Sequence, residues 1–213
     1  MNLGELRENY AQSGIEVSDM EADPFLQFEQ WMIQAQEAQI IEPNAMTLST
    51  SNASGDVSSR TVLLKGLEND GFEFFTNYDS HKGQDLASHP KAALTFLWKE
   101  LERQVCVQGV VEKTCRETSE QYFHSRPYGS QIGAWVSERQ SGAIPDRAYL
   151  EARDAEMREK FPEGEEVPLP DFWGGYRLIP TVIEFWQGRP SRLHDRLSYR
   201  KKGDAWKISR LSP

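Results

Sequence analysis

The sequence predicts a mainly β protein of the α+β class, an antiparallel barrel with helices at its periphery. About seven or eight segments with strand-like patterning follow one another at short spacing between residues 45 and 211. Few helical segments separate them, so the regular alternation of strand and helix that indicates a parallel sheet is missing. Short strands joined by turns are typical of antiparallel barrels.

Composition and charge restrict the possible functions. The chain has 213 residues and a formal net charge of −9, which argues against a general nucleic-acid binder. An anionic ligand must therefore be held by a local group of Arg and Lys side chains. Two cysteines and four histidines make neither a disulfide framework nor a metal centre. Without a signal-peptide core or an apolar run that could span a bilayer, a cytoplasmic, reduced protein is predicted.

The N-terminal part divides into an arm and the start of the folded domain. Residues 1–22 are polar and predict a mobile arm, while 23–213 predict one domain. Asp23 and Pro24 are suited to the N-cap and first position of a helix. A core-facing stripe at helical spacing follows in Phe25, Phe28, Trp31, Met32 and Ala35. In the arm, Arg7 and Tyr10 are either solvated or part of a lid that closes on a ligand.

Three strands are expected next, over 45–50, 57–67 and 72–76. The turns between them are short, so they predict an antiparallel meander. Arg60 and Lys65 fall on the second strand at an odd separation. We expect them on opposite faces, serving different partners.

Two polar segments are candidates for binding an anion. Ser80 can cap a short helix over 84–88, and His81 and Lys82 beside it are either a phosphate-binding turn or a solvated basic turn. Further on, Tyr122 and Arg126 share a face if the helix over 118–124 continues to Arg126, just before Pro127. The remaining elements expected are strands over 91–98, 103–113, 174–179, 181–186 and 204–211, and a charged helix from Asp146 to Lys160.

The segment 184–196 places several charged groups close together. If the chain is extended there, Arg192 and His194 project from one face. A fixed cation beside an imidazole suits an anionic substrate that exchanges a proton or hydride. The alternative is an exposed, charged strand end.

Common catalytic motifs are absent. The sequence contains no Walker motif, no Gly-x-Gly-x-x-Gly before a helix and no Gly-x-Ser-x-Gly. Basic and hydroxyl side chains instead accompany Trp and Tyr on strands and loops. This pattern suits a flat aromatic cofactor with a phosphate tail.

Several long motifs, in order along the chain, resemble the pyridoxine/pyridoxamine 5′-phosphate oxidase family. The matching runs are RTVLLK at 60–65, LERQV at 101–105, YFHSRP at 122–127, SQIGAW at 130–135, VPLP at 167–170, FWGG at 172–175, IEFWQG at 183–188, RLHDR at 192–196, WKI at 206–208 and RL at 210–211. They span nearly all of the chain from Pro24 onward.

The resemblance implies a split β-barrel homodimer with FMN at the subunit interface. The FMN-binding residues it implies are Arg60, Thr61, Val62, Leu63, Leu64, Lys65, Phe75, Thr76, His81, Lys82, Gln104, Gln140, Ser141, Trp186 and Arg196. His81 stands where the family commonly has Arg, so a phosphate contact there is expected to depend on pH.

The resemblance also implies the substrates, pyridoxine 5′-phosphate and pyridoxamine 5′-phosphate. Their 5′-phosphate would meet Lys65, Tyr122, Arg126 and Ser130. Arg192, Leu193 and His194 would lie at the pyridine ring, with Arg192 and His194 as the catalytic pair and Arg7 and Tyr10 covering the ring. Hydride would pass to FMN, and O2 would reoxidise it to give hydrogen peroxide. The alternatives are a related split-barrel flavin reductase and a non-catalytic carrier of pyridoxal phosphate.

Overall fold

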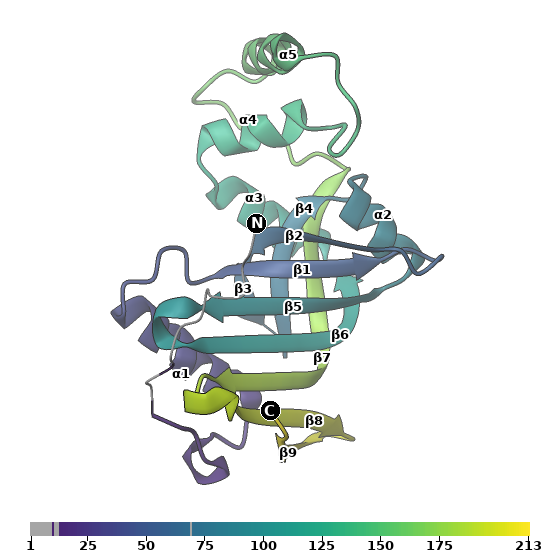
Figure 1. The fold of residues 1–213 in the computed structure, drawn as a ribbon. Helices are drawn as coiled ribbons and strands as arrows, with labels where there is room; N and C mark the ends of the chain where they lie inside the picture. The colour runs from purple at the N-terminus through teal and green to yellow at the C-terminus, as the bar shows by residue number, and fades with distance from the viewer. Residues whose placement is uncertain (1–9, 11–12, 69) are drawn as a thin grey trace, which may run out of the picture.

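The computed structural model describes residue 10 and residues 13–213 except residue 69. Within them, nine strands form one curled antiparallel sheet in the order β2-β1-β5-β6-β7-β4-β3, and β8 and β9 continue from β7 (Figure 1). The expected antiparallel barrel is confirmed. The strands are β1 Ala45–Ser51, β2 Val57–Leu63, β3 Gly66–Glu68, β4 Gly71–Asn77, β5 Lys91–Trp98, β6 Arg103–Lys113, β7 Trp173–Gln187, β8 Asp195–Lys202 and β9 Ala205–Leu211.

Five α-helices accompany the sheet in the described ranges. They are α1 Pro24–Glu37, α2 His81–Ser88, α3 Arg116–Ser125, α4 Tyr128–Val136 and α5 Arg147–Lys160, with 3-10 turns at Val17–Asp19, Lys99–Leu101 and Pro190–Arg192. None of the described helices is both long and apolar enough to cross a membrane. Helix α4 was not expected, because its segment was interpreted only as a motif.

The predicted meander is wrong. The expected strand over 57–67 is two strands, β2 paired with β1 and β3 paired with β4, at opposite ends of the strand order. Between them, the Leu64 N–H donates to the Asn44 carbonyl at 2.9 Å and the Lys65 N–H donates to the Glu73 carbonyl at 2.8 Å. The chain therefore passes from one edge of the sheet to the other at these two residues.

A second prediction, of separate strands over 174–179 and 181–186, is also wrong. Strand β7 runs unbroken through Pro180, which pairs with Gly109 of β6 beside a register shift at Gln108. A bulge removes the regular ladder hydrogen bond that proline cannot donate. A Cβ on Gly109 would lie 2.1 Å from the Ile179 carbonyl oxygen, so glycine is required for this close approach.

The main core lies between α1 and the concave side of the sheet. Asp23 caps α1 by accepting a hydrogen bond from the Phe25 N–H at 2.9 Å, as expected. Phe28 is fully buried, with its ring 4.9 Å from Phe96 and 5.1 Å from Phe72 between centroids. The apolar stripe of α1 is therefore core, as its spacing predicted.

A second, smaller core joins α3, α4 and α5 to the start of β7. Its buried side chains include Phe123, Ile132, Met157 and Trp173. Figure 1 shows these helices beyond the end of the sheet, with β7 (light green) running from them to the end where β8 and β9 lie. Strand β7 thus connects two distant parts of the molecule.

We expect Phe28→Ala to reduce the free energy of unfolding by about 3–5 kcal/mol, because it leaves a cavity among three aromatic rings. Urea denaturation of the apoprotein measures this change. Leu26→Ala is the matched control, because Leu26 lies on the same helix with half of its side chain exposed. Similar losses in the two variants would contradict the assignment of the core.

Candidate active site

One cavity of about 620 Å³ contains most of the predicted binding residues. We call it the cationic cavity. It lies between β2, β4, α2, α3 and α4, and its lining includes Arg60, Thr61, Val62, Leu63, Lys65, Phe75, Thr76, Lys82, Tyr122, Arg126, Ser130 and Gln140. Leu64 is the exception within the 60–65 run, because its side chain is buried in the main core.

Arg60 and Lys65 both line this cavity, so the expectation of opposite faces is wrong. The alternation rule holds only while a strand continues, and β2 ends at Leu63. The change of direction at Leu64 and Lys65 brings the second cation back to the same cavity. The two cations nevertheless have different neighbours there.

At one end of the cavity, the first turn of α2 presents Lys82. Its Nζ lies 3.2 Å from the Thr76 hydroxyl and 3.3 Å from the Gln140 side-chain oxygen. Ser80 caps the helix as expected, accepting from the Gly83 N–H at 3.3 Å. Burial, and then the charge of Arg60, lower the pKa of Lys82. Arg60 and Lys82 both line this cavity, and two cations there suit a phosphate.

His81 and Ser141 do not line the cationic cavity. They line a neighbouring pocket of about 610 Å³, and Gln140 borders both spaces. The His81 Nε2 lies 3.6 Å from the Asp85 carboxylate, and its side chain is 60% exposed. The imidazole is thus directed to a carboxylate of its own helix.

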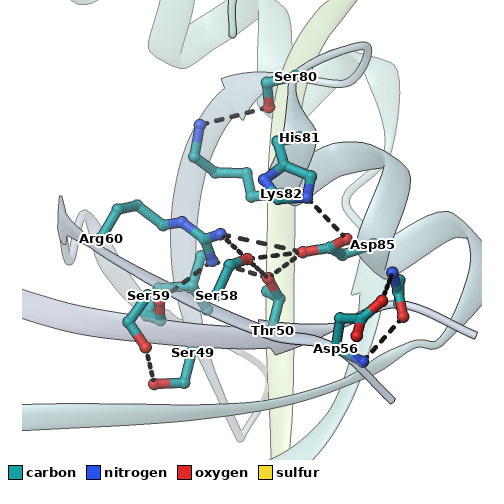
Figure 2. A network of polar contacts seen from close by, with 12 residues as sticks. Ser49, Thr50, Asp56, Ser58, Ser59, Arg60, Ser80, His81, Lys82 and Asp85 are labelled. Carbon is teal, nitrogen blue, oxygen red and sulfur yellow. Dashed lines mark hydrogen bonds and ion pairs between the residues drawn. The ribbon is translucent and has the colours of Figure 1, made fainter. Parts of the chain in front are cut away.

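Behind Arg60 lies a polar network that the sequence did not reveal. Asp85 on α2 is 3% exposed, and its carboxylate accepts hydrogen bonds from Thr50 and Ser58 (Figure 2). Only the burial of an acidic residue on an amphipathic helix marks this site, and burial is not readable from the sequence alone. No group of three or more His, Cys, Asp or Glu side chains in the described ranges is arranged to hold a metal ion.

At the other end of the cavity, aromatic rings surround Arg126. Tyr122 stacks on Phe75 with centroids 4.0 Å apart, and the Arg126 guanidinium lies 4.8 Å from the Trp173 ring centroid. One guanidinium nitrogen, Nη1, is buried and has no hydrogen-bond partner among the described residues. Burial lowers the pKa of Arg126. A buried, unpaired cationic donor is costly, so this position fits an anionic group of a ligand.

A second group of predicted residues, which we call the aromatic cluster, lies elsewhere. Tyr10, Gln104 and Trp186 line a pocket of about 500 Å³. The His194 ring packs against it, 4.6 Å from Trp186 and 5.5 Å from Tyr10 between centroids. Arg7 lies outside the described residues.

The expected extended conformation at Arg192 is wrong. Pro190–Arg192 form a 3-10 turn in which Ser191 and Arg192 have left-handed φ angles of 58° and 62°. Strand β8 begins only at Asp195. Arg192 and Leu193 are exposed, whereas His194 is partly buried and its Nδ1 accepts a hydrogen bond from the Arg189 N–H at 3.1 Å. The turn, not strand alternation, sets the directions of these side chains.

Two carboxylates organise the surroundings of the aromatic cluster. Glu184 accepts two hydrogen bonds from Arg196 at 2.8 and 3.0 Å, and this pairing raises the pKa of Arg196. Asp195 accepts from the Ile15 N–H at 3.2 Å and from Arg210 at 2.5 Å. Arg210 also donates to the Ile15 carbonyl at 2.9 Å. The segment that follows Tyr10 is thereby fastened to β8 and β9.

The cationic cavity and the aromatic cluster are too far apart to hold one small ligand between them. Trp173 of the cavity and Trp186 of the cluster stand at opposite ends of β7, thirteen positions apart. At the usual rise of a strand, this is about 40 Å of strand length. One chain therefore carries two separate groups of site residues.

Comparison with known proteins gives a consistent result along the chain. Residues 32–161 match the family model described as pyridoxamine 5′-phosphate oxidase. Residues 173–213 match the pyridoxine 5′-phosphate oxidase C-terminal dimerisation region. A pyridoxine/pyridoxamine 5′-phosphate oxidase of Ralstonia pickettii is 54% identical over 213 residues, covering all of this chain and 99% of the relative. One from Paraburkholderia phymatum is 57% identical over 212 residues, 99% of each chain.

Solved structures share the split-barrel fold. PhzG from Burkholderia lata 383, solved in complex with tetrahydrophenazine-1-carboxylic acid, has a TM-score of 0.86 at 30% identity and covers 92% of this chain and 95% of its own. A pyridoxamine 5′-phosphate oxidase-related, FMN binding protein from Nostoc punctiforme has a TM-score of 0.72 at 13% identity, over 91% of this chain and 100% of its own. The second likeness concerns the fold alone.

We expect inorganic phosphate to stabilise the apoprotein by binding in the cationic cavity. At phosphate of about ten times its dissociation constant, the melting temperature should rise by about 2–5 °C over sodium chloride of equal ionic strength. Arg126→Ala and Lys82→Ala should each reduce this rise, and Lys202→Ala, an exposed change on β8, should not. Equal rises in all four proteins would show that phosphate acts elsewhere.

Proposed function

This chain belongs to the pyridoxamine 5′-phosphate oxidase family, and from that premise we propose that it oxidises pyridoxamine 5′-phosphate and pyridoxine 5′-phosphate to pyridoxal 5′-phosphate. FMN would supply the hydride acceptor, and O2 would return it to its oxidised form with release of hydrogen peroxide. The protein would bind and orient both molecules in the cytoplasm.

The observation that carries the proposal is the buried Nη1 of Arg126, which has no hydrogen-bond partner in the described part of the chain. A phosphate monoester would supply the negative charge and the acceptor oxygens that pair with this guanidinium. Lys65, Tyr122 and Ser130 line the same cavity, so we assign these four residues to the 5′-phosphate of the substrate.

The other end of the cavity suits the phosphate of FMN. Arg60 and Lys82 supply the charge there, and Thr76 and Gln140 lie within hydrogen-bonding distance of Lys82. We assign the cofactor to the residues implied by the resemblance: 60–65, Phe75, Thr76, His81, Lys82, Gln140 and Ser141. Leu64 would act indirectly, by holding its neighbours in place, because its side chain is buried in the core and its N–H is bonded to the Asn44 carbonyl.

A complete site needs two copies of the chain. The aromatic cluster lies at the far end of β7, so it would serve the cationic cavity of a second subunit. This arrangement agrees with the match of residues 173–213 to a dimerisation region. In a homodimer, each site would receive Gln104, Trp186, Arg192, Leu193, His194, Arg196 and the arm residues Arg7 and Tyr10 from the second copy.

The hydrogen bond at His194 bears on its role. Its Nδ1 accepts from the Arg189 N–H, so in the neutral ring the proton lies on Nε2. A protonated Nε2 donates a hydrogen bond to the substrate and cannot accept a proton from it. We therefore assign His194 to orienting the substrate. The exposed Arg192 would place the ring and stabilise charge as the C4′–H bond breaks.

Other activities remain in competition. A split-barrel flavin reductase would use a nicotinamide cofactor, and a carrier would bind the vitamer without turnover. PhzG indicates that an unphosphorylated aromatic carboxylate is also bound within this fold. The two cationic ends of one cavity favour a phosphorylated substrate beside a phosphorylated cofactor.

An oxygen-consumption assay tests the proposal directly. With FMN bound, pyridoxamine 5′-phosphate and pyridoxine 5′-phosphate should each consume oxygen and release hydrogen peroxide. Pyridoxine without phosphate should have a kcat/KM lower by a factor of about 100 or more, since it lacks the charge-assisted bonds to Arg126 and Lys65. A protein that cannot be loaded with FMN, or that turns over only NADPH, would refute the proposal.

A mixed dimer tests the shared site. Arg126→Ala should mainly raise KM, and Arg192→Ala should lower kcat while FMN stays bound. A dimer with one chain of each kind, isolated with two different tags, should regain about half of the wild-type activity per dimer at substrate below KM. It regains this activity because one of its two sites contains neither substitution. If each chain formed its own site, the mixed dimer would be as defective as the single variants.

A further inference from the structure

Asp85 is a buried acid beside Arg60, and none of the predicted binding roles includes it. It stands in the second half of α2, four residues after His81, with 3% of its side chain exposed. Its carboxylate lies 3.9 Å from the Arg60 guanidinium, which is too long for a hydrogen bond. The contact between the two charges is therefore made through other groups.

Two hydroxyl groups connect them (Figure 2). Thr50 of β1 donates to the Asp85 Oδ2 at 2.6 Å, and Ser58 of β2 donates to it at 3.0 Å. The Arg60 Nη1 in turn donates to the Thr50 oxygen at 2.7 Å, and its Nη2 donates to the Ser58 oxygen at 2.5 Å. Each hydroxyl thus accepts one hydrogen bond from Arg60 and donates one to Asp85.

The direction of this relay follows from the chemistry of the hydroxyl group. A hydroxyl has one hydrogen to donate and lone pairs to accept with. While Asp85 is a carboxylate, it takes both hydrogens, so both oxygens face Arg60 as acceptors. If Asp85 were neutral, either hydroxyl could turn its hydrogen toward the guanidinium and lose that bond.

Asp85 keeps its charge despite being buried. Burial alone raises the pKa of this carboxyl, but the hydrogen bonds from Thr50 and Ser58 and the charges of His81 and Arg60 outweigh it and lower the pKa. Lys82 is a further basic side chain nearby. Its pKa is lowered mainly by burial and, to a smaller extent, by the charge of Arg60. One anion therefore stands behind a group of basic side chains that line the cavity and its neighbour.

We propose that Asp85 is a positioning residue that holds Arg60, through Thr50 and Ser58, in the orientation that binds the phosphate of FMN. The inference rests on the proposed function, because it requires FMN in the cationic cavity. Arg60 is also bonded to the Leu48 carbonyl at 3.2 Å, so three acceptors fix its guanidinium plane. With Arg60 already in place, binding the cofactor costs less side-chain entropy.

Riboflavin distinguishes this role from a merely structural one, because it has the same ring system as FMN and no phosphate. For Asp85→Asn, we expect the affinity of the apoprotein for FMN to fall by about 10- to 100-fold. Its affinity for riboflavin should stay within about twofold of the wild-type value. Flavin fluorescence during titration with the apoprotein measures both constants, without any assay of turnover.

Two further variants complete the test. Ser58→Ala removes one hydroxyl and leaves Asp85 charged, so it should weaken FMN alone by about 3- to 10-fold. It decides the question if Asp85→Asn does not fold. Asp56→Asn removes the same charge from the neighbouring exposed turn and should leave both affinities unchanged.

The possible results separate the two proposals. Equal losses for FMN and riboflavin, or no loss for either, would overturn the role of Asp85 while the proposed oxidase stands. A wild-type protein that binds neither flavin would overturn the proposed function itself. Loss confined to FMN in both Asp85→Asn and Ser58→Ala is the result expected.

Discussion

The architecture depends on a length constraint in the chain. Strands β2 and β3 lie at opposite ends of the strand order, yet only Leu64 and Lys65 separate them. A connection this short spans at most about 11 Å. The sheet must therefore curl until its edges meet. Leu64 is bonded to Asn44 beside β1 and Lys65 to Glu73 of β4, so adjacent residues belong to opposite edges. Because Arg60 to Lys65 form this junction, closing the barrel also creates one wall of the cationic cavity.

Local patterns in the sequence predicted the elements better than their pairing. The cap at Asp23 and the apolar stripe of α1 depend on neighbours within a few positions, and both are confirmed. The break after Leu63 was missed because the apolar run continues through it, and only the different partners on its two sides, β1 for β2 and β4 for β3, reveal it. Pro180 suggested a strand end, but β7 continues through a bulge in which Thr181 is the extra residue, and the partners that define this bulge, Gln108 and Gly109 of β6, are far away in the sequence.

The candidate site shows the same limit. The motifs named the residues that line the cationic cavity, because charge and hydroxyl chemistry are visible in the sequence. They did not show that Phe75 of β4 pairs near the start of β7 while Trp186 lies at its far end. This separation follows from strand length and sheet order. Nor did they identify Asp85, whose importance comes from burial beside two hydroxyls of other strands. The cationic cavity shows that a chain with an acidic net charge can still present a locally cationic surface.

The hydrogen bonds of Ile15 with Asp195 and Arg210 join the segment before α1 to the last two strands. Arg210 stands three residues before the last residue of the sequence, so a tag or label fused after Pro213 would be close to the base of the N-terminal arm. Trimming the C-terminus past Arg210 would remove one of the two side chains that hold that base, even though no residue of the arm had been altered. In crystallography and protein engineering with this chain, the choice of C-terminal boundary is therefore also a choice about the N-terminal segment.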